Sequence, residues 1–289
     1  PRMEQYREAS RAVQEIFADY TALIEPLSLD EAYLDVSDSK ACKGSATLIA
    51  QEIRRRVREE VGITISAGIA PNKFIAKVAS DWNKPDGQYV VLPDQVDEFV
   101  KELPVKKIFG VGKVTAAKMH SLGIQTCGDL RPYSEEELGA LFGSFGAKLF
   151  RLARGIDERA VNPDRIRKSL SVENTYVQDL PNLQACLDKL PELHEQLETR
   201  LQRVHTDYDV SKKYVKLKFN DFVSTTIEAM SLTTELEGYI ALCSDAFVRG
   251  NRPVRLLGLG VKLELKANSK PNPKQLTHPS KRQLRLRLE

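Results

Sequence analysis

The sequence predicts a multi-domain α+β protein, and three stretches of different pattern lead to this expectation. Strand-like and helix-like patterns alternate up to residue 93, helical periodicity broken by glycines runs from 94 to about 160, and strands return between 170 and 267. A length of 289 residues exceeds one average domain, and 42% hydrophobic with 29% charged residues favours packed cores over wholesale disorder. We therefore expect two or three folded domains.

The first stretch has the element order of a small α+β domain. Apolar spacing predicts, in order, a helix over 4–20, a strand pair over 27–36, a helix over 45–60 closed by Gly62, a strand over 63–70, a helix over 72–81 and a strand over 88–92. Pro26 ends the first helical region, because proline cannot continue a helix. We expect the strands to form antiparallel hairpins.

The second and third stretches differ from each other in periodicity. Residues 94–160 predict short helices only, and Asn162-Pro163-Asp164 marks a linker. Beyond it we expect strands over 170–177, 214–219, 225–230 and 254–265, with helices over 183–204 and 236–247. This order is β-α-β-β-α-β, a split βαβ domain of roughly 100 residues.

Composition limits the class of protein. The net charge of +3 is only mildly basic, but from Arg252 to Arg287 basic residues recur with Glu264 as the single acid. Four widely spaced cysteines form neither a metal signature nor a disulfide framework, so we expect reduced thiols in a cytoplasmic protein. No apolar run approaches the ~20 residues that span a bilayer, so no membrane association is expected.

Two adjacent carboxylates are the strongest candidates for chemistry. Asp30 and Glu31 lie in the string Ser28-Leu29-Asp30-Glu31-Ala32-Tyr33-Leu34-Asp35-Val36, with apolar residues on both sides. Neighbouring acids repel each other, and a hard cation such as Mg²⁺ removes that repulsion while it keeps coordination sites open for phosphates. The pattern indicates metal-assisted phosphoryl chemistry, and a solvated hairpin turn is the alternative.

This string resembles the palm motif of Y-family translesion DNA polymerases. Three further resemblances follow in the order of that family: 66–70 with 72–73 and 76–77, then 80–88, then 108–113. The resemblance extends from Pro1 to the last residues. It implies a partial α/β palm over 1–93, a helical thumb over 94–160, a linker over 161–169, a little finger over 170–267 and a flexible tail over 268–289.

The resemblance also implies roles for the candidate residues. Asp30 would be a metal ligand, Glu31 a ligand or a proton acceptor at the primer end, and Lys84 a contact for the triphosphate. The activity would be lesion-tolerant, non-proofreading DNA synthesis with two Mg²⁺ ions. Primer–template DNA, dNTP and a sliding clamp would be the partners of a monomer associated with the bacterial nucleoid.

Two segments are candidates for binding DNA phosphates. Gly110, Val111, Gly112 and Lys113 open a helix, whose N-terminus offers free N–H groups and partial positive charge, and the pattern resembles a helix–hairpin–helix. Lys168, Ser169, Lys216 and Lys218 fall on expected strands, where Lys216 and Lys218 share a face. A packed helix turn and an ordinary solvated sheet face are the respective alternatives.

The two ends of the chain depart from the family pattern. Family members begin with a strand that carries a further metal-binding Asp and continue into a fingers domain, whereas Pro1 resembles a point inside the palm. We therefore expect little polymerisation by this chain alone, and a non-catalytic DNA- and clamp-binding fragment is the alternative. A helix–hairpin–helix adaptor is a third possibility that the paired acids disfavour.

The last residues resemble a clamp-binding peptide. Gln283 would bind the groove rim, and Leu284, Leu286 and Leu288 would be its apolar anchors. The intervening arginines are unusual for such a peptide. A disordered basic tail is the alternative, and Leu288-Glu289 could derive from a vector.

Overall fold

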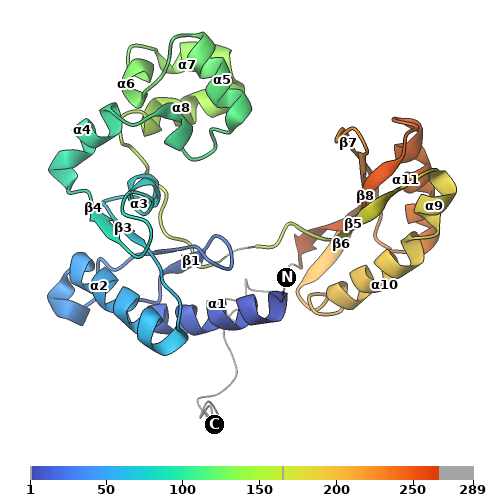
Figure 1. The fold of residues 1–289 in the computed structure, drawn as a ribbon, viewed down its shortest axis with the longest axis horizontal. Helices are drawn as coiled ribbons and strands as arrows, with labels where there is room; N and C mark the ends of the chain where they lie inside the picture. Colours follow the sequence, from blue (N-terminus) through green and yellow to red (C-terminus); the bar gives the residue numbers. More distant parts are fainter. Residues whose placement is uncertain (1, 165, 267–289) are drawn as a thin grey trace. The chain divides into compact units, whose positions relative to one another are not determined.

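A computed structural model describes residues 2–164 and 166–266, and the chain divides after Pro163 into two compact units. The first unit opens with the expected mixture of helices and strands (Figure 1). Its elements are α1 (Met3–Ala18), β1 (Ile24–Pro26), β2 (Ala32–Leu34), α2 (Ala46–Arg56), β3 (Ala67–Ile69), α3 (Lys73–Ala79) and β4 (Gln88–Val90). None of the helices in the described residues is long and apolar enough to cross a membrane.

The strands of this unit pair in two separate two-stranded sheets. β1 and β2 are antiparallel, with Ile24 opposite Leu34, so the expected strand pair over 27–36 begins earlier and leaves residues 27–31 as its turn. β3 and β4 are parallel, which corrects the expectation of antiparallel hairpins throughout. The reason is α3, because a helical crossover returns the chain to the starting edge of a sheet.

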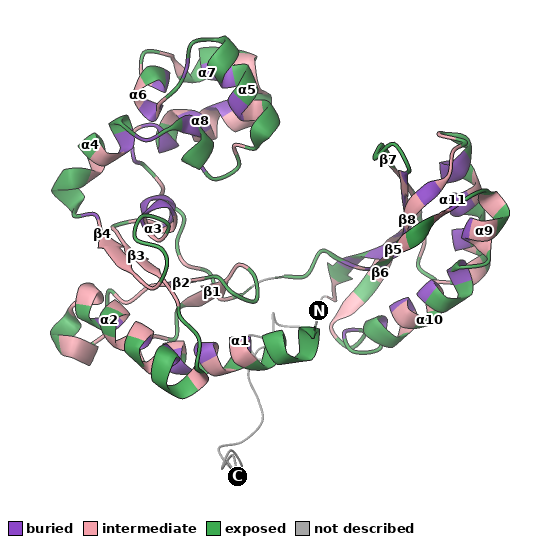
Figure 2. Ribbon diagram, in the orientation of Figure 1, coloured by how far each residue is buried: buried purple, intermediate pink, exposed green. Residues whose placement is uncertain are grey.

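The helical part of the first unit shares its core with α3. It comprises α4 (Val96–Lys101), α5 (Lys113–Ser121), α6 (Cys127–Leu130), α7 (Glu135–Phe142) and α8 (Gly146–Leu152). Phe74, Ile75 and Val78 of α3 belong to the same buried cluster as Met119 and Leu149 of these helices. Figure 2 shows α3 as one of the buried segments of the unit. This burial holds α3 in place beside the candidate site.

The second unit is the expected β-α-β-β-α-β domain. Its elements are β5 (Ser169–Leu180), α9 (Leu183–Leu187), α10 (Leu190–Leu201), β6 (Tyr208–Phe219), β7 (Ser224–Met230), α11 (Leu236–Val248) and β8 (Val254–Leu265), and the antiparallel sheet has the order β5-β8-β6-β7. The single helix expected over 183–204 is divided in two. Pro191 explains the division, since it lacks the N–H that a continuing helix needs and is favoured in a first turn.

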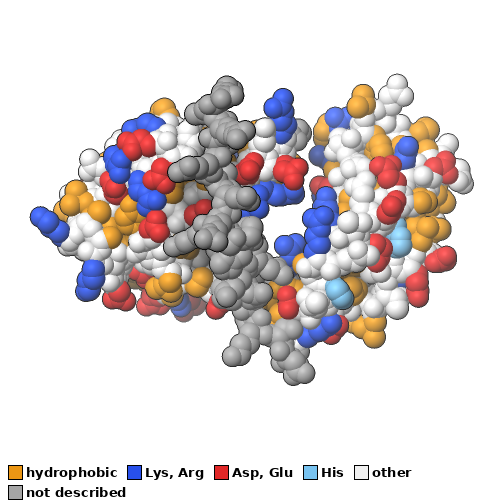
Figure 3. Space-filling view, turned by 90° about the horizontal axis from the view of Figure 1, so that it is seen from below, with side chains coloured by type: hydrophobic (Ala, Val, Ile, Leu, Met, Phe, Trp, Pro, Cys, Tyr) orange, Lys and Arg blue, Asp and Glu red, His pale blue; other side chains and the backbone are white. Residues whose placement is uncertain are grey.

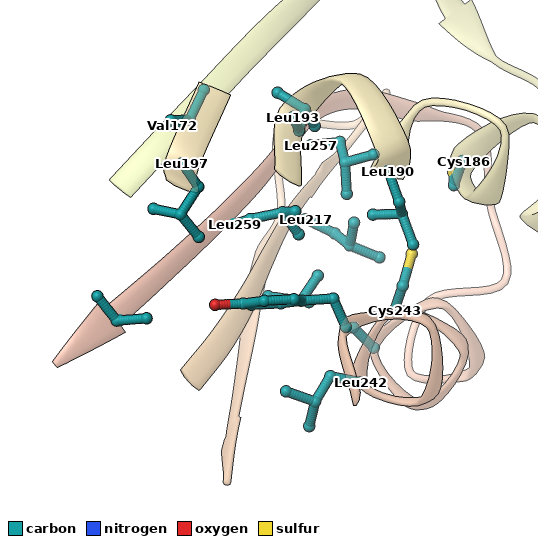
Figure 4. Close-up of a cluster of buried hydrophobic side chains, with 14 of the residues drawn as sticks. Val172, Cys186, Leu190, Leu193, Leu197, Leu217, Leu242, Cys243, Leu257 and Leu259 are labelled. Carbon is teal, nitrogen blue, oxygen red and sulfur yellow. The ribbon is translucent and has the colours of Figure 1, made fainter. Parts of the chain in front are cut away.

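The helices of the second unit cover one face of the sheet and leave the other open. Figure 4 shows Leu193 and Leu197 of α10 and Leu242 of α11 against Leu217 and Leu259 of the strands. All five side chains are buried. The opposite face of β6 therefore presents its alternate residues to solvent, as the period of two predicted for Lys216 and Lys218.

Candidate active site and nucleic-acid interface

The turn between β1 and β2 presents both acids to solvent. The amide of Leu27 donates to the carbonyl oxygen of Glu31 at 2.8 Å and closes the turn. Ser28 Oγ donates to the Asp30 carboxylate, and the Asp30 amide donates back to Ser28 Oγ at 3.3 Å. Asp30 and Glu31 are exposed, so their oxygens are accessible to a cation or a ligand.

Helix α3 supplies a cation to this turn. Lys77 Nζ donates to Glu31 Oε1 at 2.5 Å, and the two side chains retain 24% and 41% exposure. The helix is positioned by Asn72, whose side chain caps it by accepting from the Ile75 amide at 3.0 Å. Lys77 was part of the motif quoted above but received no role there, because only the fold shows that α3 passes the acidic turn.

Lys84 also lies within electrostatic reach of the two acids. Its ammonium is 2.7 Å from Asp81, and this bond is the main cause that raises the pKa of Lys84, with smaller contributions from Glu31 and Asp30. The same bond lowers the pKa of the Asp81 carboxyl. Since the Lys84 side chain is 53% exposed, it can exchange Asp81 for another anion.

A second, more buried set of charges fixes the segment after α8 against α3. Lys73 is 7% exposed; it forms an ion pair with Glu25 and donates to the carbonyl oxygen of Ala160 at 3.1 Å. Burial raises the pKa of the Glu25 carboxyl, but Lys73 and the amide of Asn162 outweigh it, so the pKa is lowered overall. Sequence reasoning missed these residues, because their contacts join positions far apart in the chain.

Asp157 completes this set. Its carboxylate accepts from the Phe74 amide in the first turn of α3 at 2.9 Å and from two nitrogens of Arg159, both at 2.7 Å. Burial acts to raise the pKa of Asp157, but Arg159 lowers it by more. The Asp157 carboxylate beside the first turn of α3 satisfies a free N–H of that helix and complements its dipole.

A groove of about 1240 Å³ runs past these groups. Asp30, Glu31, Lys77 and Lys84 line one part, and apolar side chains of α1, α2 and β3 line another. Within residues 2–164 and 166–266, no cluster of three or more His, Cys, Asp or Glu side chains is arranged to hold a metal ion. The paired carboxylates are hard oxygen donors that suit Mg²⁺, but a cation here needs further ligands, such as phosphate oxygens and water.

The segment 110–113, a candidate for DNA phosphates, forms a turn that leads into α5. Gly110 has a φ of 99°, Val111 turns back with its amide 2.9 Å from the Ile108 carbonyl oxygen, and Gly112 precedes α5. Lys113 is the first residue of α5, and the next residue, Val114, is 85% exposed. The first amides of α5 are therefore directed to solvent, where an anion can bind.

The open sheet face carries four lysines. Strand register places Lys216 and Lys218 of β6 with Lys212, while Lys262 of β8 lies opposite Lys212. Ser169 lies at the exposed start of β5, opposite Lys262, and the exposed Lys168 directly precedes it. Lys212 and Lys262 were not predicted from the sequence, since only the strand register shows that they share this face.

The candidate clamp-binding residues lie beyond the part of the chain that the structure describes. These are Gln283, Leu284, Leu286 and Leu288.

Three family models match successive parts of the chain. The impB/mucB/samB family matches residues 1–81, the thumb domain of DNA polymerase iota matches 106–157, and the C-terminal domain of the impB/mucB/samB family matches 167–277. Two DNA polymerase IV proteins are similar over 91% of this chain and 75% of their own length. That of Ectopseudomonas mendocina (strain ymp) is 60% identical over 263 residues, and that of Pseudomonas fluorescens (strain Pf0-1) is 59% identical over 264.

The chain belongs to the Y family of DNA polymerases. It is a DNA-directed DNA polymerase by family and is close to bacterial DNA polymerase IV. A solved Y-family polymerase chimera of Dbh and Dpo4 has a TM-score of 0.81 at 25% identity, over 90% of this chain and 76% of that one. The family resemblance and the multi-domain α+β class are therefore confirmed.

Proposed function

We propose that this Y-family chain supplies catalytic and DNA-binding groups for the addition of dNTPs to a primer opposite damaged template bases, without proofreading. The observation that supports this most directly is the Asp30-Glu31 turn, which has Lys77 bound to Glu31 and Lys84 within electrostatic reach. Carboxylates for cations and ammonium groups for phosphates are the two kinds of group that phosphoryl transfer requires.

Each group has a distinct role in this proposal. Asp30 would hold Mg²⁺, and Glu31 would either hold it too or accept the proton of the primer hydroxyl. Bound Mg²⁺ would neutralise charge on the phosphates and favour loss of that proton. Lys84 leaves Asp81 and compensates the charge that builds up on the leaving pyrophosphate. Lys77 keeps the Glu31 carboxylate oriented when no Mg²⁺ is bound.

DNA is held by phosphate contacts that carry no sequence information. The hairpin 110–113 supplies helix amides, and the sheet face supplies Lys168, Ser169, Lys216 and Lys218. In this assignment the palm covers 1–93, the thumb 94–160, the linker 161–169 and the little finger 170–267. Removing Lys216 and Lys218 should flatten the dependence of log K on log salt by at most about two units.

The test of the catalytic assignment is isosteric substitution of the acids. Asp30→Asn and Glu31→Gln should each lower turnover by several orders of magnitude while DNA affinity stays nearly unchanged. Asp38→Asn is the matched control, because Asp38 is exposed a few residues beyond the same strand pair. Turnover should be measured in two proteins. One is the 289-residue chain, and the other is this chain fused to the residues of a DNA polymerase IV relative that lie outside the matched 75%.

We expect the 289-residue chain alone to extend primers weakly or not at all, since two carboxylates are too few to hold two cations. Robust dNTP incorporation by the pure chain would overturn this expectation. DNA binding without incorporation in both forms would favour the second candidate function, a non-catalytic DNA- and clamp-binding protein. Normal turnover of both acid variants would remove Asp30 and Glu31 from the site.

The tail 268–289 is assigned to a sliding clamp. Gln283 would bind a groove rim and Leu284, Leu286 and Leu288 would fill the groove, with an affinity no tighter than about micromolar, near −8 kcal/mol. Deleting 283–289 should abolish clamp binding and leave affinity for primer–template DNA unchanged. Clamp affinity that survives the deletion would place the contact on the folded little finger and leave the tail as a basic appendage.

A further inference from the structure

Carboxylates already hold three of the four lysines on the open sheet face. Glu228 on β7 accepts from Lys212 at 2.6 Å and also forms an ion pair with Lys262. Glu173 on β5 accepts from Lys216 at 2.9 Å. Lys218 differs, since its ammonium lies 4.7 Å from the centre of the Phe222 ring.

The backbone of β8 allows the contact between Glu173 and Lys216 to cross the sheet. Gly258 lies between Glu173 on β5 and Lys216 on β6 in the strand register. A Cβ at residue 258 would lie 2.8 Å from the Cβ of Glu173, so a side chain there would displace the Glu173 end of the pair. The Glu173–Lys216 pair is therefore arranged by the sheet and does not depend on flexible loops.

These ion pairs compete with DNA for the same ammonium groups. The two lysines lower the pKa of Glu228 to about 2, so this carboxylate stays charged at every pH at which DNA would bind. When a phosphate takes Lys212 or Lys262, Glu228 is left uncompensated close to the phosphate. Repulsion between the two anions then reduces what each new contact contributes to affinity.

We propose that Glu173 and Glu228 are positioning residues that stand in for DNA phosphates on this face and so limit DNA affinity and its salt dependence. This inference rests on the proposed binding of DNA by the sheet. The carboxylates hold three of the ammonium groups over the open face and offset two of its four lysine charges. Figure 3 shows acidic and basic side chains intermixed on the side of the protein that it presents.

Glu228→Gln tests the proposal in the full chain. The probe is a fluorescent primer–template duplex, titrated by anisotropy at several salt concentrations. Freeing Lys212 and Lys262 should tighten binding roughly threefold to tenfold, the size expected for exposed ion pairs. It should also steepen the slope of log K against log salt by up to about 1.8, since each new phosphate contact adds about 0.9.

Glu195→Gln is the matched control. It removes the same charge from α10, which covers the other face of the sheet, and Glu195 is exposed there. It should leave the salt slope unchanged. Equal effects of the two variants would overturn the proposal, because net charge alone would then explain the gain.

A double-mutant cycle locates the effect. In a Lys212→Ala/Lys262→Ala background, Glu228→Gln should no longer steepen the slope, and Glu228→Asp in the native background should behave like the parent chain. A gain that persists without the two lysines would contradict the proposal. The Lys216→Ala/Lys218→Ala variant separates DNA binding by the sheet from the role of the carboxylates. A salt slope unchanged in this variant would refute DNA binding by the sheet. A flattened slope, together with no effect of Glu228→Gln, would refute only the role of the carboxylates.

Discussion

The buried carboxylate of Asp157 should be a main determinant of the stability of the unit that holds the candidate active site. The Asp157 side chain is 4% exposed and joins the segment after α8 to the first turn of α3. Asn72 makes a parallel link, because its side-chain amide donates to the Gly155 carbonyl oxygen at 2.8 Å. Asp157→Ala removes the charged half of this junction and leaves the amide half in place.

The magnitude follows from the groups that the substitution leaves unpaired. The Phe74 residue is 0% exposed, so its amide loses its acceptor in a place that water reaches poorly, which costs about 1–3 kcal/mol. Arg159 is 42% exposed and can turn to water, so its loss of a partner adds only about 0–1 kcal/mol. We expect a total of about 1–4 kcal/mol, or a Tm lower by roughly 2–16 °C for a unit of this size.

Trp82 makes the assay specific to this unit. It is the single tryptophan of the sequence, and its ring lies 5.1 Å from that of Phe99, so its fluorescence reports unfolding around α3. Urea or thermal unfolding of Asp157→Ala should be compared with Glu158→Ala. Glu158 is 80% exposed with its closest cation at 3.8 Å, and its loss should change stability by less than about 0.5 kcal/mol.

The pH dependence identifies the charge as the cause. Because the pKa of Asp157 is lowered from 3.8 by folding, its contribution is complete above pH 4 and is lost as pH falls through the folded pKa. The gap in stability between the parent chain and Asp157→Asn should therefore be widest near neutral pH and narrow in acid. A destabilisation below 1 kcal/mol, or a gap that does not depend on pH, would refute this account of the junction.

Two other predictions concern the nucleic-acid surfaces. Gly110→Ala should destabilise the hairpin by about 1–2 kcal/mol and weaken binding of DNA of any sequence, because the φ of Gly110 is 99° and an added Cβ would lie 3.1 Å from the Phe145 ring. Gly139→Ala in α7 is the control, since a Cβ there would have nothing within 4 Å. This control should not weaken DNA binding. Glu228 should titrate near pH 2 by carboxyl NMR and return toward 4.5 when Lys212 and Lys262 are replaced by Ala, and a titration unaffected by those replacements would contradict the ion pairs.

Local patterns predicted the elements well where one period dominated. The strand over 254–265 coincides with β8, and the helix over 236–247 differs from α11 by one residue. The sheet face followed from the alternation of buried residues with Lys216 and Lys218. In these segments burial on one face is the main constraint, and the spacing of apolar residues along the sequence reveals it.

Contacts between distant segments were not predictable in the same way. The meeting of Lys77 with Glu31 depends on the packing of α3 beside the β1–β2 turn, and the meeting of Asp157 with Phe74 joins positions 83 apart. The pairing of β3 with β4 was predicted in the wrong orientation, because short strands of three residues carry little pattern. Such details are set by tertiary packing, which the sequence period does not encode.

The same electrostatic arrangement recurs beside the candidate active-site turn and on the sheet. At the turn, Lys84 holds Asp81 at 2.7 Å, and on the sheet Lys216 holds Glu173 at 2.9 Å. In both places an exposed carboxylate occupies an ammonium that we assign to a phosphate. Exchange of one anion for another yields less net affinity than binding to a free cation, because the displaced carboxylate remains close to the new anion. A polymerase built in this way would position its lysines before substrate arrives and would release DNA readily, and loss of the carboxylates should therefore slow dissociation more than it speeds association.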